Sequence, residues 1–195
     1  MKPNKDDVIA WRGPILDRAL TQLLADVHWG DLDYLLLDLP PGTGDRARSR
    51  GQKEPTAEER VGPTPHPAAC EVAERAGTMA ALMNQKIIGV VENMSWLAFT
   101  APDTGKEYRI DLFGSGGGQE AADALSKRLG TEVPLLAQVP MDIELRKGGD
   151  EGDPIVTAHP ESPAAQAIVE LAKNLDSRPR GLSGMHLGVS PTNNA

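Results

Sequence analysis

The chain of 195 residues is short of several residue types, and each shortage excludes a class of protein. It has a single cysteine, Cys70, which cannot form an internal disulfide, and this favours a reducing compartment. No apolar run approaches the length of about 18 residues that spans a membrane, and the N-terminus lacks the apolar core of a secretion signal. With 28 acidic and 20 basic residues, the net charge of -8 argues against non-specific nucleic-acid binding. We therefore expect a cytoplasmic protein that binds neither membrane nor nucleic acid.

Ligand spacings for metals and a lysine loop for triphosphates are missing as well. The sequence holds no CxxC and no HxxxH, so its cysteine and histidines have no recognisable metal-ligand spacing. No glycine-rich loop ends in Gly-Lys-Ser/Thr. The run 114–118 (GSGGG) precedes a predicted helix and could bind an anion at the helix N-terminus or form a flexible connection. We favour the flexible connection, because the run lacks the lysine of a P-loop.

What the chain does contain is apolar strands that alternate with amphipathic helices. Nearly continuous apolar strands at 34–39 (YLLLDL), 86–92 and 133–139 are typical of a parallel sheet covered on both faces. We predict a doubly wound, mostly parallel α/β sheet in one domain, 1–176, followed by a flexible tail, 177–195. The other elements expected are helices at 14–27, 68–85, 119–129, 141–147 and 163–175, a short strand at 107–113 and a loop at 93–106.

Residues 45–66 differ from the rest of the chain. They mix charges of both signs with three prolines, and Val61 is their only large aliphatic residue, so they have little apolar surface to offset the entropy of ordering. A central strand at 58–65 would bury unpaired charge, and Pro63 and Pro65 would remove hydrogen-bond donors from it. We therefore expect a mobile loop, a sheet that forms without this strand, reduced stability and a tendency to associate.

Asp38 is the first candidate for chemistry. An aspartate at the tip of a buried strand can hold Mg²⁺ through its water shell beside a nucleotide. The turn that follows contains Gly42, Thr43 and Gly44, whose backbone N–H groups could approach a terminal phosphate. The alternative is an ordinary strand-end turn capped by Asp45. For the whole string DLPPGTGD we favour the origin in a nucleotide site.

Asn93 and the Pro140 region follow two other predicted strands. The amide of Asn93 could pair with a purine edge, or the residue could simply occupy a strand-end turn. The backbone near Pro140 and Asp142 could line a base pocket, or Asp142 could be the N-cap of a helix. Because ligands of such sheets bind outside the carboxyl ends of the strands, we expect Asp38, Asn93 and Pro140 to gather on one edge.

Several strings, taken in order, resemble one known family. WRGP, WGDLDYLLLDLPPGTGD, GVVENMSW, LFGSGGG, VPLLAQVPMD and GGDEGDPIV are similar to the Mrp-type P-loop ATPases of the actinobacterial type, relatives of the iron–sulfur cluster carriers. The resemblance implies a doubly wound sheet of the deviant Walker A class, a homodimer that binds ATP with Mg²⁺, and delivery of an iron–sulfur cluster to apoproteins. It assigns Asp38 to the Walker B-type aspartate, 42–45 to the phosphate-sensing switch, Asn93 to adenine recognition and the Pro140 region to the base-lining loop.

The chain departs from this family in two further ways. The first strand and lysine loop of the family are expected before Met1, so the fold is expected to be incomplete. The CxxC pair that holds a bridging cluster is absent after the ENM string, so no cluster ligand can be identified. We expect an iron–sulfur cluster carrier ATPase by resemblance, with negligible ATP hydrolysis by this chain alone. The alternative is a non-catalytic interaction module that dimerises with a full-length relative, and a partition or positioning ATPase ranks last.

Overall fold

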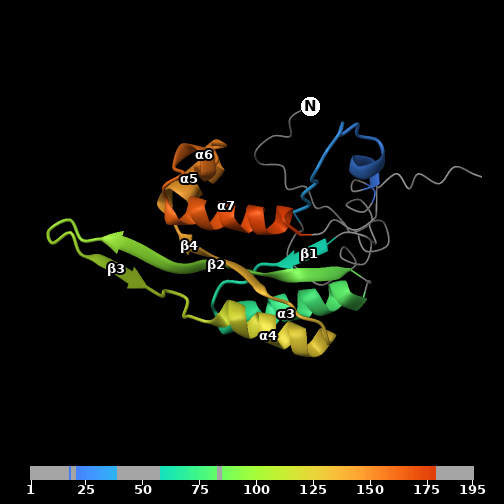
Figure 1. The fold of residues 1–195 in the computed structure, drawn as a ribbon, viewed down its shortest axis with the longest axis horizontal. Coiled ribbons are helices and arrows are strands. Elements are labelled where there is room, and N and C mark those ends of the chain that lie inside the picture. Colours follow the sequence, from blue (N-terminus) through green and yellow to red (C-terminus); the bar gives the residue numbers. More distant parts are fainter. Residues whose placement is uncertain (1–17, 19–20, 39–57, 83–84, 179–195) are drawn as a thin grey trace, which may run out of the picture.

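The computed structural model describes residues 18, 21–38, 58–82 and 85–178 (Figure 1). Within these residues, no helix is long and apolar enough to cross a membrane. The elements in chain order are β1 (Glu58–Val61), α3 (Pro67–Leu82), β2 (Lys86–Thr100), β3 (Glu107–Ile110), α4 (Gly117–Leu129), β4 (Leu135–Met141), α5 (Ile143–Glu151), α6 (Ile155–Ala158) and α7 (Pro163–Asp176).

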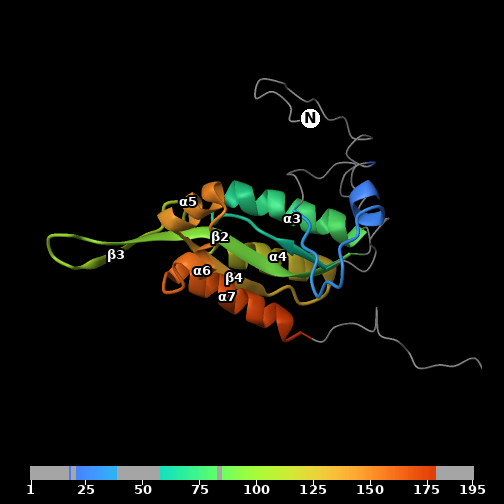
Figure 2. The ribbon, with the colours of Figure 1, turned by 90° about the horizontal axis from the view of Figure 1, so that it is seen from above.

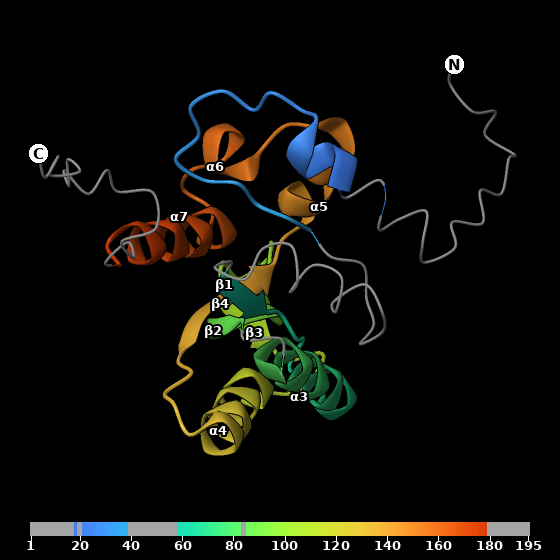
Figure 3. The same ribbon diagram turned by 90° about the vertical axis from the view of Figure 1, so that its right-hand side faces the viewer.

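Strand β2 lies at the centre of a four-stranded sheet. It pairs in parallel with β1 and with β4, and its outer half pairs antiparallel with β3. Helices α3 and α4 cover one face of the sheet, while α5, α6 and α7 lie on the other side (Figure 3). This arrangement confirms the predicted α/β fold with a mostly parallel, doubly covered sheet.

Each face of the sheet has its own apolar core. Under α3 and α4, the side chains of Val90 and Leu125 are fully buried, and Gly77 lets the two helices approach closely around Leu125. Under α7, Ala164 and Ala165 pack on Val139. Small residues on the helices and branched residues on the strands allow the close approach that buries β2 on both sides.

Strand β1 corrects the prediction that 58–65 loops out of the sheet. Glu58 and Arg60 are exposed, Val61 is buried, and Glu58 forms an ion pair of 3.4 Å with Lys86 of β2. Within the described residues β1 lies at the edge of the sheet. Charged side chains that would strongly destabilise a buried central strand are therefore exposed to solvent here. Pro63 lies just past the strand, where its carbonyl accepts a hydrogen bond of 2.9 Å and its missing N–H is not needed.

The loop predicted at 93–106 is largely strand, which is a second correction. Strand β2 continues to Thr100 and forms a hairpin with β3, which we call the arm, and the arm projects beyond the helices (Figures 1 and 2). The rings of Phe99 and Tyr108 stack at 5.4 Å, and the Arg109 guanidinium lies 4.1 Å from the centre of the Trp96 ring. These cross-strand pairs, which a reading of single residues does not reveal, extend the strand past the core.

The third correction concerns the strand predicted at 34–39. Its described residues form no strand, and Leu36 is 74% exposed. The hydroxyl of Tyr34 donates a hydrogen bond to the carboxylate of Asp176, at the C-terminal end of α7. An apolar run favours burial but does not specify a partner strand. Here the hydrogen bond from Tyr34 holds the segment beside the C-terminal end of α7 instead. Of the helix predicted at 14–27, residues 18 and 21–25 are helical, and the other positions up to 20 lie outside the described residues.

Candidate functional site

Two of the predicted site residues come together at the carboxyl end of β4 and in the middle of β2, where the regular parallel pairing of these strands ends. Asn93 is the register partner of Val139, so it lies next to Pro140 on the adjacent strand. Asn93 is exposed and Pro140 is buried. These positions place an exposed amide at the end of the parallel part of the sheet, the edge where such sheets bind ligands.

The backbone at Asn93 is held by hydrogen bonds, and the next residue, Met94, has a strained conformation. Its N–H donates to the carbonyl of Pro63 at 2.9 Å, and its Oδ1 accepts from the N–H of Met94 at 2.9 Å. Among the described residues, Met94 is the only non-glycine with a positive φ, at 54°. Such a conformation costs about 1–3 kcal/mol and persists only where the surroundings impose it. Among the described residues, the Nδ2 group of Asn93 makes no hydrogen bond, and the residue is exposed, so this group is available to donate to a ligand.

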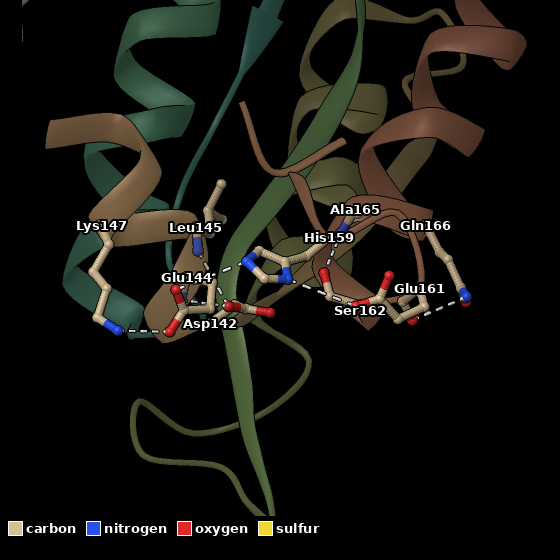
Figure 4. Close-up of polar contacts among 9 residues, drawn as sticks. All are labelled: Asp142, Glu144, Leu145, Lys147, His159, Glu161, Ser162, Ala165 and Gln166. Carbon is tan, nitrogen blue, oxygen red and sulfur yellow. Dashed lines mark hydrogen bonds and ion pairs between the residues drawn. The ribbon is translucent and has the colours of Figure 1, made fainter. Parts of the chain in front are cut away.

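Asp142 follows at the same edge and serves as the N-cap of α5. Its Oδ1 accepts from the backbone N–H of Glu144 at 2.7 Å and from that of Leu145 at 3.1 Å (Figure 4). The capping alternative is therefore correct. A carboxylate with both bonds on Oδ1 can still present its other oxygen, so the cap does not exclude a contact with a nucleotide.

A cluster of charged side chains beside Asp142 was not predicted from the sequence. Figure 4 shows the His159 ring between two carboxylates, with its Nε2 3.9 Å from Glu144 and its Nδ1 3.7 Å from Glu161. Glu144 also pairs with Lys147 at 2.7 Å. All four side chains are more than 40% exposed, so these pairs contribute little stability. Helix α6, which was not predicted, lies between α5 and His159.

Glu92, the residue before Asn93, is the feature that sequence reasoning missed most clearly. Its side chain is 1% exposed, and among the described residues it is the only buried carboxylate. One oxygen accepts from the N–H of Gly118 at 2.6 Å, and the other accepts from Nε2 of Gln138 at 2.7 Å. An acidic residue at the end of an otherwise apolar strand is the signal that could have marked it, because buried charge requires partners.

Two of the glycines in the run 114–118 are required for packing, a role that the sequence did not predict, and two others have a positive φ. Gly116 caps α4 with φ of 83°, in the left-handed region. A Cβ on Gly117 would lie 2.2 Å from the carbonyl oxygen of Pro65, and one on Gly118 would lie 2.7 Å from Cβ of Glu92. The first turn of α4 therefore binds an anion, but the anion is the chain's own Glu92 carboxylate.

Cys70 lies behind this turn and does not fit a cluster ligand. Its Sγ is 3.1 Å from the carbonyl oxygen of Gly117, and the residue is 4% exposed. Burial, followed by the nearby charges of Glu120, Glu92 and Glu74, raises the pKa of the thiol above its ordinary value. The thiolate is the form that binds metal, so a raised pKa and burial disfavour ligation. The described residues contain no group of three His, Cys, Asp or Glu side chains that could hold a metal ion.

Asp38 does not lie at the end of a strand, contrary to prediction. It is exposed and lies outside any strand, four residues after Tyr34, which is held at the C-terminus of α7. Arg178 follows α7 and donates to the carbonyl of Ile88 at 3.0 Å, which places that helix end beside the start of β2. Among the described residues, Asn93 and Pro140 thus lie on neighbouring strands, while Asp38 does not end a strand beside them. Gly42, Thr43 and Gly44 lie outside the described residues.

Comparison with protein families and curated relatives gives consistent matches. The family described as ParA, the NUBPL iron-transfer P-loop NTPases, matches residues 1–176. The chain is 52% identical over 184 residues to the iron–sulfur cluster carrier protein of Mycobacterium leprae, covering 94% of this chain and 47% of that protein. It is 40% identical to the carrier of Saccharolobus solfataricus, covering 87% of this chain and 54% of the relative. The chain thus spans about half the length of the curated relatives it matches.

Solved structures agree on the fold. A nucleotide-binding protein from Archaeoglobus fulgidus, in complex with ADP, is 34% identical with a TM-score of 0.55, over 71% of this chain and 53% of that chain. The septum site-determining protein MinD from Pyrococcus horikoshii, complexed with Mg-ADP, has a TM-score of 0.55 at 24% identity, over 89% of this chain and 59% of that chain. The second likeness concerns the fold alone.

Proposed function

The chain belongs to the family of NUBPL iron-transfer P-loop NTPases, and on that premise we propose that its Asn93 edge binds the base of an adenine nucleotide within an iron–sulfur cluster carrier. The single observation that supports this most is the pairing of Asn93 with Val139, which sets an exposed amide beside Pro140. The strained backbone at Met94 adds support, since backbone strain concentrates at ligand sites.

The residues of this edge would act by binding and orienting. The Nδ2 of Asn93 would donate to an acceptor nitrogen of the base, and the Pro140 region would cover one side of it and exclude water. Asp142 holds the start of α5 beside this edge. A bound ATP supplies phosphoanhydride chemistry, for which the chain lacks the lysine loop, and we propose no hydrolytic step by this chain alone.

The wider activity of the family is part of the same proposal. The cargo would be an iron–sulfur cluster delivered to apoproteins by a homodimer that binds ATP with Mg²⁺. In this chain the one cysteine, Cys70, is buried, so it is poorly placed to hold a cluster. The contribution of this chain alone would therefore be the base-binding edge and the arm. Asp38 would contact the metal, and Gly42 to Gly44 the phosphates, only in the dimer that binds ATP with Mg²⁺.

The proposal predicts that adenosine and ATP bind the chain with similar affinity. Because the contacts are to the base, removing the phosphates should change the Kd by less than about threefold. Both ligands should bind weakly, with a Kd of about 1 mM. Titration of each ligand, followed by two-dimensional amide NMR spectra, should shift the signals of Asn93, Met94 and Met141. Guanosine serves as the control ligand, and Asn93→Ala should abolish the adenosine shifts. Phosphate release from ATP should not exceed the background.

Two outcomes would contradict this proposal. ATP binding about 100-fold tighter than adenosine would mean that a phosphate site is present and dominant. Adenosine shifts that map away from Asn93 and the carboxyl end of β4 would exclude the proposed base site.

A second candidate, the non-catalytic module that dimerises with a full-length relative, is favoured by one observation. The apolar side chains at 32–36 are uncovered, with Leu32 49%, Tyr34 52% and Leu35 43% exposed. Sedimentation of the chain with the full-length carrier of Mycobacterium tuberculosis should then give a complex, and Leu35→Glu should weaken it. Independent sedimentation of the two proteins at equal concentrations would exclude this function.

A further inference from the structure

Glu92 joins three elements through one carboxylate. It lies at the end of the parallel part of β2, and its two oxygens bind Gly118 in the first turn of α4 and Gln138 in β4. The N-cap of α4, Gly116, has no side chain to satisfy the first N–H groups of the helix. Glu92 supplies that acceptor from a distant point of the sequence, where the helix dipole also favours negative charge.

The same carboxylate closes the base of the arm. Beyond Glu92 the chain runs out along the arm and comes back to Gly118 in α4, 26 positions later, and the hydrogen bond joins these two points. The hydroxyl of Ser95 donates to the carbonyl of Glu92 at 3.1 Å, so the backbone is held on the outer side as well. The arm therefore cannot turn about its base without breaking a buried, charge-assisted hydrogen bond.

Asn93 and Met94 lie within this closed segment. The positive φ of Met94 persists only because bonds on both sides impose it, and the bonds of Glu92 are the buried ones. Asn93 is anchored on its own side by the bond from its N–H to Pro63. If the carboxylate were removed, relaxation of Met94 would turn the Asn93 amide away from the edge.

We propose that Glu92 is a positioning residue, which fixes Asn93 and the base of the arm as one rigid unit through its bonds to Gly118 and Gln138. Its effect on ligand binding rests on the proposed function, whereas its effect on Asn93 does not. No substitution at Glu92 should touch the ligand directly, because the side chain is buried and bonded within the protein. Because Asn93 and the base of the arm form one unit, adenosine that contacts Asn93 should also affect the arm.

The test compares three variants of the full chain by amide hydrogen exchange and adenosine titration. Glu92→Leu should speed exchange of the Asn93 amide by at least about tenfold relative to that of Val90, and should weaken adenosine binding by about tenfold. Glu92→Gln should restore both to within about twofold, because its Oε1 can accept from Gly118 while Gln138 turns its own oxygen toward the new amide. Gly118→Ala should act like Glu92→Leu, since its Cβ would lie 2.8 Å from Oε2 of Glu92.

Matched controls separate positioning from general loss of stability. Glu120→Gln removes an exposed carboxylate from the same helix turn, and Gly149→Ala adds a Cβ with nothing within 4 Å. Both should leave Asn93 exchange unchanged. If Glu92→Leu does not fold, Gln138→Ala removes one of the two bonds from an exposed position and should speed Asn93 exchange about threefold.

Each result decides one of the two proposals. Unchanged Asn93 exchange in Glu92→Leu, or in Gln138→Ala where the former does not fold, overturns the positioning role, whatever adenosine does. Failure of Glu92→Gln to rescue the exchange overturns it as well. Absence of adenosine binding to the unmodified chain refutes the proposed function, while the exchange readout still decides on Glu92.

Discussion

Gly117→Ala should lower the free energy of unfolding by about 3 kcal/mol, the cost at the upper end of overpacking a core. The new Cβ would lie 2.2 Å from the carbonyl oxygen of Pro65, 2.7 Å from its carbonyl carbon and 2.8 Å from Sγ of Cys70. Two of these atoms are backbone, and Pro65 is buried, so no side chain can simply turn aside. Equilibrium unfolding in urea, followed by far-UV circular dichroism, measures the change.

Gly149→Ala provides the matched control for that substitution. It places alanine in helix α5 with nothing within 4 Å of the new Cβ, and it should stabilise the protein by about 0.5–1 kcal/mol through helix propensity. Equal stability of the Gly117 and Gly149 variants would show that the first turn of α4 does not pack against the segment after β1.

Leu125→Ala should cost about 3 kcal/mol, whereas Leu36→Ala should cost less than about 0.5 kcal/mol. Leu125 is fully buried under α3 and α4, and its removal leaves a cavity beside Val90 and Gly77. Leu36 is 74% exposed and has little to lose. Urea unfolding of the two variants measures both changes in one experiment.

The two leucine substitutions test whether the structure or the sequence pattern predicts the loss of stability correctly. By pattern alone, both residues lie in strongly apolar segments and both substitutions would be costly. A loss of 2 kcal/mol or more in Leu36→Ala would place 34–38 inside a packed sheet, against the observed geometry. A loss below about 1 kcal/mol in Leu125→Ala would contradict the core under α4 instead.

Periodicity was sufficient for the elements whose burial is decided locally. Helices α3, α4 and α7 lie within a few residues of their predicted bounds, because an apolar stripe at helical spacing needs only a sheet face beneath it. Strands depend on a partner, which the sequence does not specify. For that reason 34–39 was predicted as a strand, yet its described residues, 34–38, form none, and EERV was predicted as loop but forms a strand at the edge of the described sheet.

The candidate site was predictable in part for the same reason. Asn93 and Pro140 follow strands that do form in parallel, so their meeting at one edge followed from topology. Asp38 depended on a strand that does not form. Glu92 was overlooked because its partners, Gly118 and Gln138, are distant in sequence, and only the folded chain shows that its charge is satisfied.

Strand β2 makes the chain unequally tolerant of insertions and deletions. Its 15 residues serve three neighbours in succession, so losing one residue between Glu92 and Leu97 would reverse the faces of every side chain beyond the break. Trp96 and Phe99 would then exchange sides with their neighbours. Additional residues at 102–105 would only lengthen the tip, so evolutionary drift in length is expected there and not along the strand.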